Sequence, residues 1–217
     1  MRCEDPAKPQ EQNVLFPMFL KLAGQTCLVI GAGCIAEAKL LQLLGTGAQI
    51  HVVAPEATPL IQQWANEGKL RWERRAFEER DLERVFLVVA CTSSTALNSR
   101  IFQAAKRYQV LCNVVDAPEL CDFFYPAIVK RGDLQIAIST SGRSPALASR
   151  IRQQLETQFG PDYEGLLRRL GTIRTKLLSR NIDPERRRNL LRRIAERGFS
   201  HRLAERPTRI QAEIAPR

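Results

Sequence analysis

Two glycines that follow an apolar run have the residue types and spacing of a dinucleotide-binding turn. Gly31 and Gly33 come directly after Cys27–Ile30, and Ala36 follows three residues later. The first glycine permits a tight turn, the second lets a diphosphate approach the backbone, and the small third residue lets a helix pack closely on a strand. The first N–H groups of that helix then face the anion. The pattern predicts a nucleotide site, with an ordinary glycine turn between strand and helix as the alternative.

The residues after the next apolar strand bear on which dinucleotide binds. An acid that contacts the ribose hydroxyls is expected roughly 20 residues past the glycines. The strand that ends at Ala54 carries none, and Glu56 follows two residues later. No Arg or Lys lies between Ala54 and Leu60 to receive a 2′-phosphate, so the sequence favours NAD over NADP. Glu56 is explained equally well as a surface acid in a turn.

A carboxylate, Asp116, stands just past the apolar strand Val110–Val114. In a doubly wound parallel sheet, the ligand crevice lies outside the carboxyl ends of the strands. A carboxylate at that edge can act as a general base when it reaches the substrate. The alternative is an Asp that caps the following turn, next to Pro118.

Hydroxyl groups at two other loops suit ligand contacts. Thr92 and Ser93 end another predicted strand, where they would meet the ribose or the nicotinamide end of the cofactor. Thr140, Ser141 and Gly142 precede a predicted helix and could hold a substrate carboxylate, or could simply cap that helix.

Alternating strands and helices must position these residues. Strands are predicted at Thr26–Ile30, Gln49–Ala54, Leu70–Arg74, Val85–Ala90 and Val110–Val114, with helices at Ile35–Leu44, Thr58–Glu67 and Ala96–Tyr108. The strands are continuous apolar runs, as expected when helices cover both faces of a parallel sheet. We therefore expect an α/β, Rossmann-like parallel sheet over residues 1–115.

The pattern changes after Asp116. A hairpin is expected at Ala127–Lys130 and Leu134–Ser139, with Gly132 in its turn. Ser144 is predicted to cap a helix that begins at Pro145, and another helix is predicted to restart at Asp183-Pro184. We expect a small α+β dimerisation and substrate-site segment at 116–150, then a helical, arginine-rich C-terminal region at 151–217.

Charge and composition limit the function classes. The formal net charge is +10, and ten arginines crowd residues 168–197. The positive electrostatic potential of so many arginines attracts polyanions. Any single arginine there is explained more simply as a solvent-exposed residue on a helix. No apolar run approaches the roughly 20 residues needed to cross a bilayer, so no membrane association and a cytoplasmic location are expected. The six cysteines form no C-x-x-C pair and there are two histidines, so no metal site is predicted.

Several segments together resemble the precorrin-2 dehydrogenase / sirohydrochlorin ferrochelatase family of the siroheme-synthase type. The resemblance is collinear over about residues 14 to 155. It is carried by Phe16-Pro-Met-Phe-Leu-Lys-Leu-Ala-Gly24, Val29-Ile-Gly-Ala-Gly-Cys-Ile-Ala36, Val52-Val-Ala-Pro-Glu56, Ala90-Cys-Thr92, Asn113-Val-Val-Asp116, Cys121-Asp-Phe-Phe-Tyr-Pro-Ala127 and Ile138-Ser-Thr-Ser-Gly-Arg-Ser-Pro145.

The resemblance implies NAD-dependent oxidation of precorrin-2 to sirohydrochlorin in siroheme biosynthesis, by a homodimer. Some family members also insert Fe²⁺ into the product. The nucleotide contacts of the family fall on Cys34, Ile35, Pro55 and Glu56, and its essential aspartate falls on Asp116. Expected substrate-binding residues are Asn113, Thr140, Ser141, Gly142 and Arg143. Arg150, Lys130 and Arg131 are further candidates for the eight carboxylates of precorrin-2.

Two other function classes fit parts of the sequence. One is an NAD-binding redox sensor with a basic nucleic-acid-binding tail. That class needs a helix-turn-helix or winged module, and the roughly 20 residues before the first strand are too few to supply one. Specific nucleic-acid binding is therefore not expected. The other class is a non-catalytic, regulatory NAD-binding scaffold, in which loss of the Asp116 carboxylate would change no activity.

Overall fold

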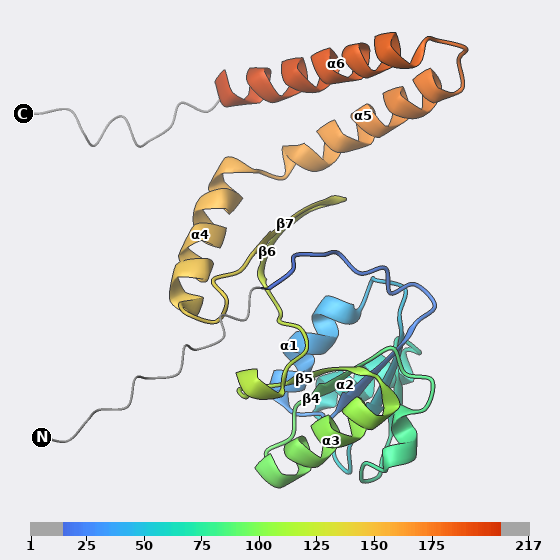
Figure 1. Cartoon of the computed structure of the whole chain (residues 1–217), viewed down its shortest axis with the longest axis vertical. Coiled ribbons are helices and arrows are strands. Elements are labelled where there is room, and N and C mark those ends of the chain that lie inside the picture. The colour runs from blue at the N-terminus through green and yellow to red at the C-terminus, as the bar shows by residue number, and fades with distance from the viewer. Residues whose placement is uncertain (1–14, 205–217) are drawn as a thin grey trace, which may run out of the picture. The chain divides into compact units, whose positions relative to one another are not determined.

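The chain divides into two compact units, residues 1–125 and 126–217. The computed structural model describes residues 15–204, with side chains through residue 198 (Figure 1). Each unit has its own sheet.

Unit 1 is built on a five-stranded, all-parallel sheet. The order is β3-β2-β1-β4-β5, so the direction of strand progression reverses between β1 and β4. The strands are β1 (Thr26–Ile30), β2 (Gln49–Val53), β3 (Arg71–Glu73), β4 (Leu87–Ala90) and β5 (Leu111–Val114). The predicted Rossmann-like sheet is thus confirmed. Such a reversal opens a ligand crevice at the carboxyl ends of the strands.

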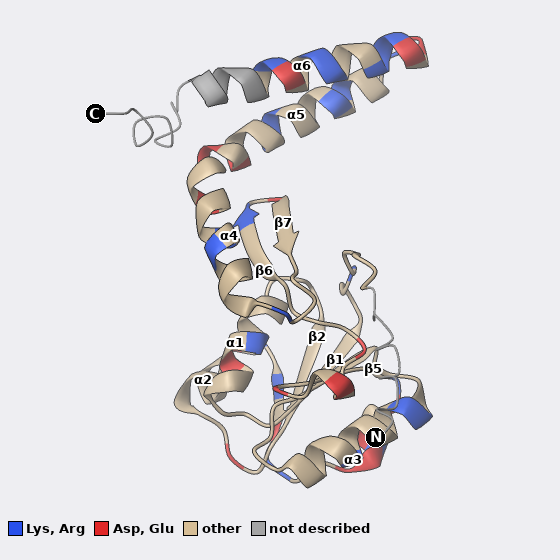
Figure 2. Ribbon diagram, turned by 60° about the vertical axis from the view of Figure 1, so that its left-hand side comes forward, with Lys and Arg blue, Asp and Glu red and all other residues tan. Residues whose placement is uncertain are grey.

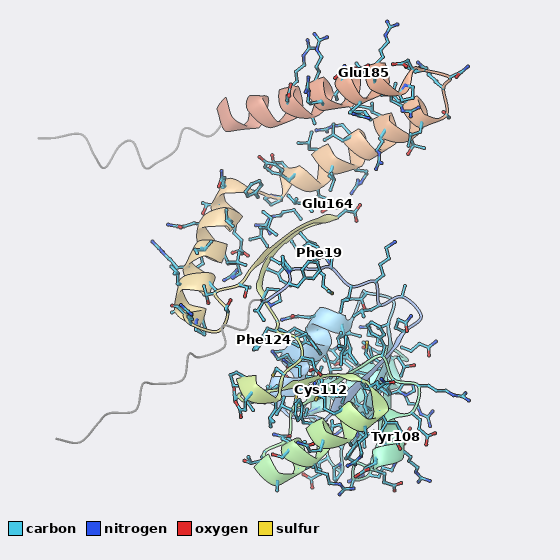
Figure 3. All side chains as sticks on the ribbon, viewed as in Figure 1. Phe19, Tyr108, Cys112, Phe124, Glu164 and Glu185 are labelled. Carbon is cyan, nitrogen blue, oxygen red and sulfur yellow. The ribbon has the colours of Figure 1, made fainter. Side chains whose placement is uncertain are left out.

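Helices cover both faces of this sheet (Figure 1). Alternate residues of β1 point to opposite faces: Cys27 and Val29 pack in a core with α1 and α2, whereas Leu28 and Ile30 pack in a second core with α3. The helices are α1 (Cys34–Leu43), α2 (Pro59–Asn66) and α3 (Thr95–Tyr108), and Tyr108 marks the end of α3 in Figure 3. Because both faces are buried, the strands are the continuous apolar runs that the sequence shows.

Two short 3₁₀ helices complete unit 1. They are η1 (Glu79–Leu82) and η2 (Pro118–Leu120). The chain after η2 stays attached to β5, because Asp122 accepts a hydrogen bond from the Cys112 N–H at 3.0 Å and forms an ion pair with Lys106. These contacts explain why the division falls at 125/126, ten residues beyond the expected boundary at 115/116.

Unit 2 begins with the predicted hairpin, β6 (Ala127–Arg131) paired antiparallel with β7 (Leu134–Ile138). Gly132, in its turn, has φ 58°, and a Cβ there would lie 2.5 Å from Cγ of Glu164, so a larger residue would be strained and would have to displace the Glu164 side chain. Glu164 lies on α5, which runs beside the hairpin turn (Figure 3).

Three helices follow the hairpin in unit 2. They are α4 (Pro145–Gln158), α5 (Asp162–Leu178) and α6 (Pro184–Ala204). The predicted start of α4 is confirmed: Ser144 is the N-cap and Pro145 the first helical residue. The predicted start of α6 at Asp183-Pro184 is also confirmed, since the Asp183 carboxylate accepts from the Arg186 N–H at 2.9 Å. Basic residues recur along α5 and α6 (Figure 2). Residues 205–217 of the expected C-terminal region lie outside the described part. No helix within residues 15–204 combines the length and apolarity needed to cross a bilayer.

Candidate dinucleotide and catalytic site

The N-terminus of α1 is open to an anion. Its N-cap is Gly33, which makes no side-chain cap hydrogen bond, and Gly33, Cys34 and Ile35 are all exposed. In α2, α3 and α4, by contrast, the first turn is capped by Thr58, Ser94 and Ser144 respectively. Among these four helices, α1 therefore keeps its first N–H groups available, as a diphosphate site requires.

The two glycines of the turn differ in what fixes them. Gly31 has φ 96°, and a Cβ there would meet the Cys91 carbonyl oxygen at 2.6 Å. Gly33 has extended backbone, and a Cβ there would enter open space. Gly31 is thus demanded by the fold itself, whereas Gly33 leaves room for a ligand. Ala36 is fully buried, which agrees with close packing of α1 on the sheet.

The carboxyl end of β2 carries Pro55 and Glu56, both exposed. The N–H of Thr58 donates to the carbonyl of Ala32 at 3.0 Å, so this loop is tied to the glycine turn. Arg74 donates from Nε to the Pro55 carbonyl at 3.3 Å. This basic side chain beside the Pro55–Glu56 loop was missed in the sequence, because it comes from the residue after β3 and pairing of parallel strands brings it near.

The carboxyl end of β4 is a hydrogen-bonded loop. Thr92 Oγ1 lies 2.7 Å from Asn98 Oδ1, and the Asn98 amide donates to the Thr92 carbonyl at 3.1 Å. Ser93 is exposed at the same edge. Asn98, a buried polar residue of α3, thus fixes the loop in which both predicted cofactor contacts lie. Its role was not visible in the sequence, since it lies within a helix whose other buried residues are apolar.

Asp116 follows β5 at the same edge of the sheet as the glycine turn. It adopts φ 60°, a left-handed conformation that Asp and Asn tolerate better than most residues, and its side chain is exposed. No hydrogen bond or ion pair joins its carboxylate to another residue within 15–204. The N–H of Val115 donates to the Ala90 carbonyl at 3.0 Å, which fixes the backbone just before it beside β4. Its side chain is therefore free to meet a ligand.

The side chain of Asn113, a predicted substrate-binding residue, is engaged within the protein. Its side chain is buried, and its amide donates to the Phe123 carbonyl at 2.8 Å. This bond holds the segment after η2 against β5, and the arrangement favours a structural role for Asn113 over direct contact with the substrate.

The remaining predicted residues lie in unit 2, in the loop between β7 and α4. Thr140 Oγ1 accepts from the Ser144 N–H at 3.2 Å, whereas Ser141 and Gly142 have φ of 51° and 76°. Ser141, Gly142 and Arg143 are exposed. Arg131, expected to meet substrate carboxylates, instead donates to carbonyl groups at the end of α4, with 2.8 Å to Phe159.

Burial acts on two thiols of unit 1, Cys27 on β1 and Cys91 just after β4. Burial raises the pKa of Cys27 to about 11 and the pKa of Cys91 to about 12. Within residues 15–204 no three His, Cys, Asp or Glu side chains come together as a metal site would need.

Family models match both units. Residues 18–127 match a family described as putative NAD(P)-binding, and residues 131–158 match the central domain of sirohaem biosynthesis proteins. The first match spans the whole parallel sheet and the glycine turn. It supports the predicted nicotinamide dinucleotide cofactor, which the family description gives as NAD(P).

Curated and solved relatives extend the match. The chain is 34% identical over 187 residues to a siroheme synthase of Nitrosococcus oceani, covering 86% of this chain and 40% of the relative. It is 37% identical over 180 residues to that of Methylococcus capsulatus, covering 83% and 38%. The chain thus spans about two fifths of the length of these relatives.

A solved structure titled SirC, precorrin-2 dehydrogenase, superposes with a TM-score of 0.72 at 31% identity. The superposition covers 87% of this chain and 92% of that one, so both units are included. The chain belongs to the siroheme synthase and precorrin-2 dehydrogenase family.

Proposed function

We propose that the protein oxidises precorrin-2 to sirohydrochlorin with NAD in siroheme biosynthesis. The observation that supports this best is the juxtaposition, at one edge of one sheet, of an uncapped helix N-terminus and an unpaired carboxylate. Similarity to siroheme synthases and to a precorrin-2 dehydrogenase supplies the substrate class.

The residues present fit the cofactor. The N–H groups of Gly33, Cys34 and Ile35 would hold the diphosphate, because the N-cap residue Gly33 makes no side-chain hydrogen bond to them. Glu56 would accept from the ribose hydroxyls, and Pro55 would pack beside the adenosine. Thr92 and Ser93 would line the path toward the nicotinamide end. When bound, NAD supplies a hydride acceptor at this edge.

Asp116 would serve as the general base. Oxidation of precorrin-2 removes a hydride and a proton, and the proton passes to the carboxylate of Asp116. Since no residue within 15–204 pairs with this carboxylate, it would not need to break an ion pair first. The fixed backbone from Val115 into the Asp116 turn keeps it at the sheet edge, where hydride transfer would occur.

The β7–α4 loop would contribute to substrate binding. Precorrin-2 carries eight carboxylates, so exposed cations and hydroxyl groups suit it. Arg143 and Ser141 have no hydrogen bond from their side chains to residues within 15–204, whereas Thr140 is partly engaged in the loop itself. We assign the first two to the substrate and Thr140 to loop geometry, with Gly142 permitting the turn.

The proposal includes a homodimer formed through unit 2, as the family resemblance implies, and the cytoplasm as the place of action. Insertion of Fe²⁺ into sirohydrochlorin is a separate step, with the metal as substrate. Addition of Fe²⁺ after oxidation is complete tests that step by itself.

One experiment tests the main proposal. Pure protein is incubated with precorrin-2 and NAD, and the absorbance spectrum is followed for sirohydrochlorin while NADH is recorded in parallel. Equal amounts of the two products are expected. Absence of both with a folded, NAD-binding protein would overturn the proposal and leave the scaffold explanation.

A further inference from the structure

Lys39, on α1, is an isolated cation in a partly buried setting. The other lysines within residues 15–204 are exposed, whereas Lys39 is half-buried. Its Nζ lies 4.1 Å from the centroid of the Tyr125 ring. No carboxylate within residues 15–204 forms an ion pair with it. A lysine held against an aromatic ring with no paired carboxylate keeps its charge available to an anionic ligand.

The geometry of α1 directs this charge toward the crevice. Side chains on a helix lean toward its N-terminus, and the N-terminus of α1 is the proposed diphosphate site. Lys39 lies two turns or less from Gly33, so its long side chain can reach back along the helix toward the carboxyl ends of the strands.

The surroundings of Cys91 place Lys39 and Asp116 in the same neighbourhood. Burial is the main cause of the raised pKa of Cys91; the charge of Lys39 lowers this pKa and the charge of Asp116 raises it. Both charges are therefore close to the thiol at the end of β4. Lys39 also lowers the pKa of Cys121, which burial raises. The cation thus faces the space between β4 and the chain that follows β5.

The Tyr125 ring holds the cation in place. Its hydroxyl group is buried and has no hydrogen-bond partner within residues 15–204, and burial raises the pKa of the phenol. The contact is consequently made by the ring face, which attracts an ammonium group through its quadrupole. A cation–π contact occupies one side of the ammonium and leaves N–H donors for another group.

We propose that Lys39 binds a carboxylate of the tetrapyrrole substrate and so holds the macrocycle beside Asp116. This inference rests on the proposed function. The diphosphate of the cofactor is a second anion that Lys39 could bind. Separate KM values for precorrin-2 and for NAD distinguish the two anions. The substrate is favoured because the cation lies on the Asp116 side of the crevice, next to the chain that follows β5.

The direct test is Lys39→Met, which keeps the aliphatic stem and removes the charge. Loss of one charge-assisted contact is expected to raise KM for precorrin-2 about tenfold, with kcat and KM for NAD unchanged. Lys39→Arg is expected to retain much of the affinity. Lys21→Met is the matched control, because this exposed lysine lies before β1, at the opposite edge of the sheet, and should leave all three constants unchanged.

Two substitutions of Tyr125 test the holding contact. Tyr125→Phe keeps the ring and removes an unpaired hydroxyl group, so KM for precorrin-2 should not change. Tyr125→Leu removes the ring and should raise this KM in the same direction as Lys39→Met. Binding of sirohydrochlorin, followed by quenching of tryptophan fluorescence without NAD, gives a readout that does not depend on turnover, and each variant is checked for its unfolding midpoint.

The outcomes separate the inference from the function on which it rests. If the unsubstituted protein turns over precorrin-2 and Lys39→Met does so with the same KM, the role of Lys39 is overturned and the function stands. A rise confined to KM for NAD would assign Lys39 to the cofactor and overturn the inference as well. If the unsubstituted protein neither oxidises precorrin-2 nor binds sirohydrochlorin, both proposals fall together.

Discussion

The first helix of unit 1 and the first helix of unit 2 begin in opposite ways. At α4, Ser144 Oγ accepts from the Leu147 N–H at 3.2 Å, and Thr140 Oγ1 accepts from the Ser144 N–H. At α1, Gly33 provides no side-chain acceptor, and the first N–H groups face outward. One helix start is completed within the chain, and the other is left for a ligand. The difference separates a structural helix start from a binding one, although both follow glycine-containing loops.

The largest effect is expected within the glycine turn, where Gly31 and Gly33 form a matched pair. Gly31→Ala should lower the free energy of unfolding by about 3 kcal/mol, because it combines a positive φ with a Cβ placed 2.6 Å from the Cys91 carbonyl oxygen. Gly33→Ala should leave stability within about 1 kcal/mol and weaken NAD binding, since the methyl group would occupy the space left for the diphosphate. Urea unfolding and NAD titration calorimetry measure the two effects. Equal destabilisation by both substitutions would show that the two glycines do not differ as described.

Converting the start of α1 into one like that of α4 sharpens the comparison. The backbone of Gly33, with φ −88° and ψ −173°, suits an N-cap residue, so Gly33→Asp should raise the stability of the ligand-free protein by about 0.3 kcal/mol. The same carboxylate would repel the diphosphate, and NAD affinity should fall more than tenfold.

The reverse substitution is Ser144→Ala, which should cost about 1 kcal/mol of stability without changing NAD affinity. For both variants, thermal unfolding without NAD measures the change in stability, and the shift of the midpoint on adding NAD measures the change in NAD affinity. Tight NAD binding by the Gly33→Asp protein would contradict the anion site at α1.

A smaller, pH-dependent effect on stability is expected from the ion pairs of Arg75, which follows β3. Arg75 bridges Glu73 and Asp81, and the Asp81 side chain is 7% exposed. Burial alone would raise the pKa of Asp81, but hydrogen bonds from Arg75 and from the Glu78 backbone bring it below its ordinary value. Because the pKa is lowered on folding, this stabilisation is present above the unfolded value near about 3.9 and is lost as pH falls through the folded value.

Asp81→Asn should therefore lower the free energy of unfolding by about 1 kcal/mol at pH 7, and the difference from the unsubstituted protein should shrink as pH falls below the unfolded pKa of about 3.9. Denaturant unfolding at several pH values measures it. A difference that stays constant with pH would show that the ion pair does not contribute.

Local patterns in the sequence predicted the parts of the fold that depend on neighbouring residues. The strand at Thr26–Ile30, the cap at Ser144 and the helix restart at Pro184 are found where they were expected, because each follows from a short run of residues. The parallel sheet followed from continuous apolar runs between helices.

Long-range contacts were beyond the sequence. Arg74 reaches Pro55 only because β3 pairs with β2, and Asn113 turns inward only because the chain after η2 folds back onto β5. Arg131 looked available for substrate, yet it closes the end of α4, 25 or more residues away. The contact of Lys39 with Tyr125 could not be predicted, since a lysine on a helix normally points to solvent. In each case a polar side chain is redirected by a partner that is distant in the chain.

The most direct test of the central claim is Asp116→Asn, measured in single turnover with precorrin-2 and NAD. Asparagine tolerates the left-handed backbone at this position and differs in being unable to take the proton. The rate of NADH formation should fall at least about 100-fold, with NAD and sirohydrochlorin affinities unchanged. Glu119→Gln, an exposed carboxylate three residues away, should keep the full rate. Turnover by Asp116→Asn at the rate of the unsubstituted protein would contradict the assignment of the base.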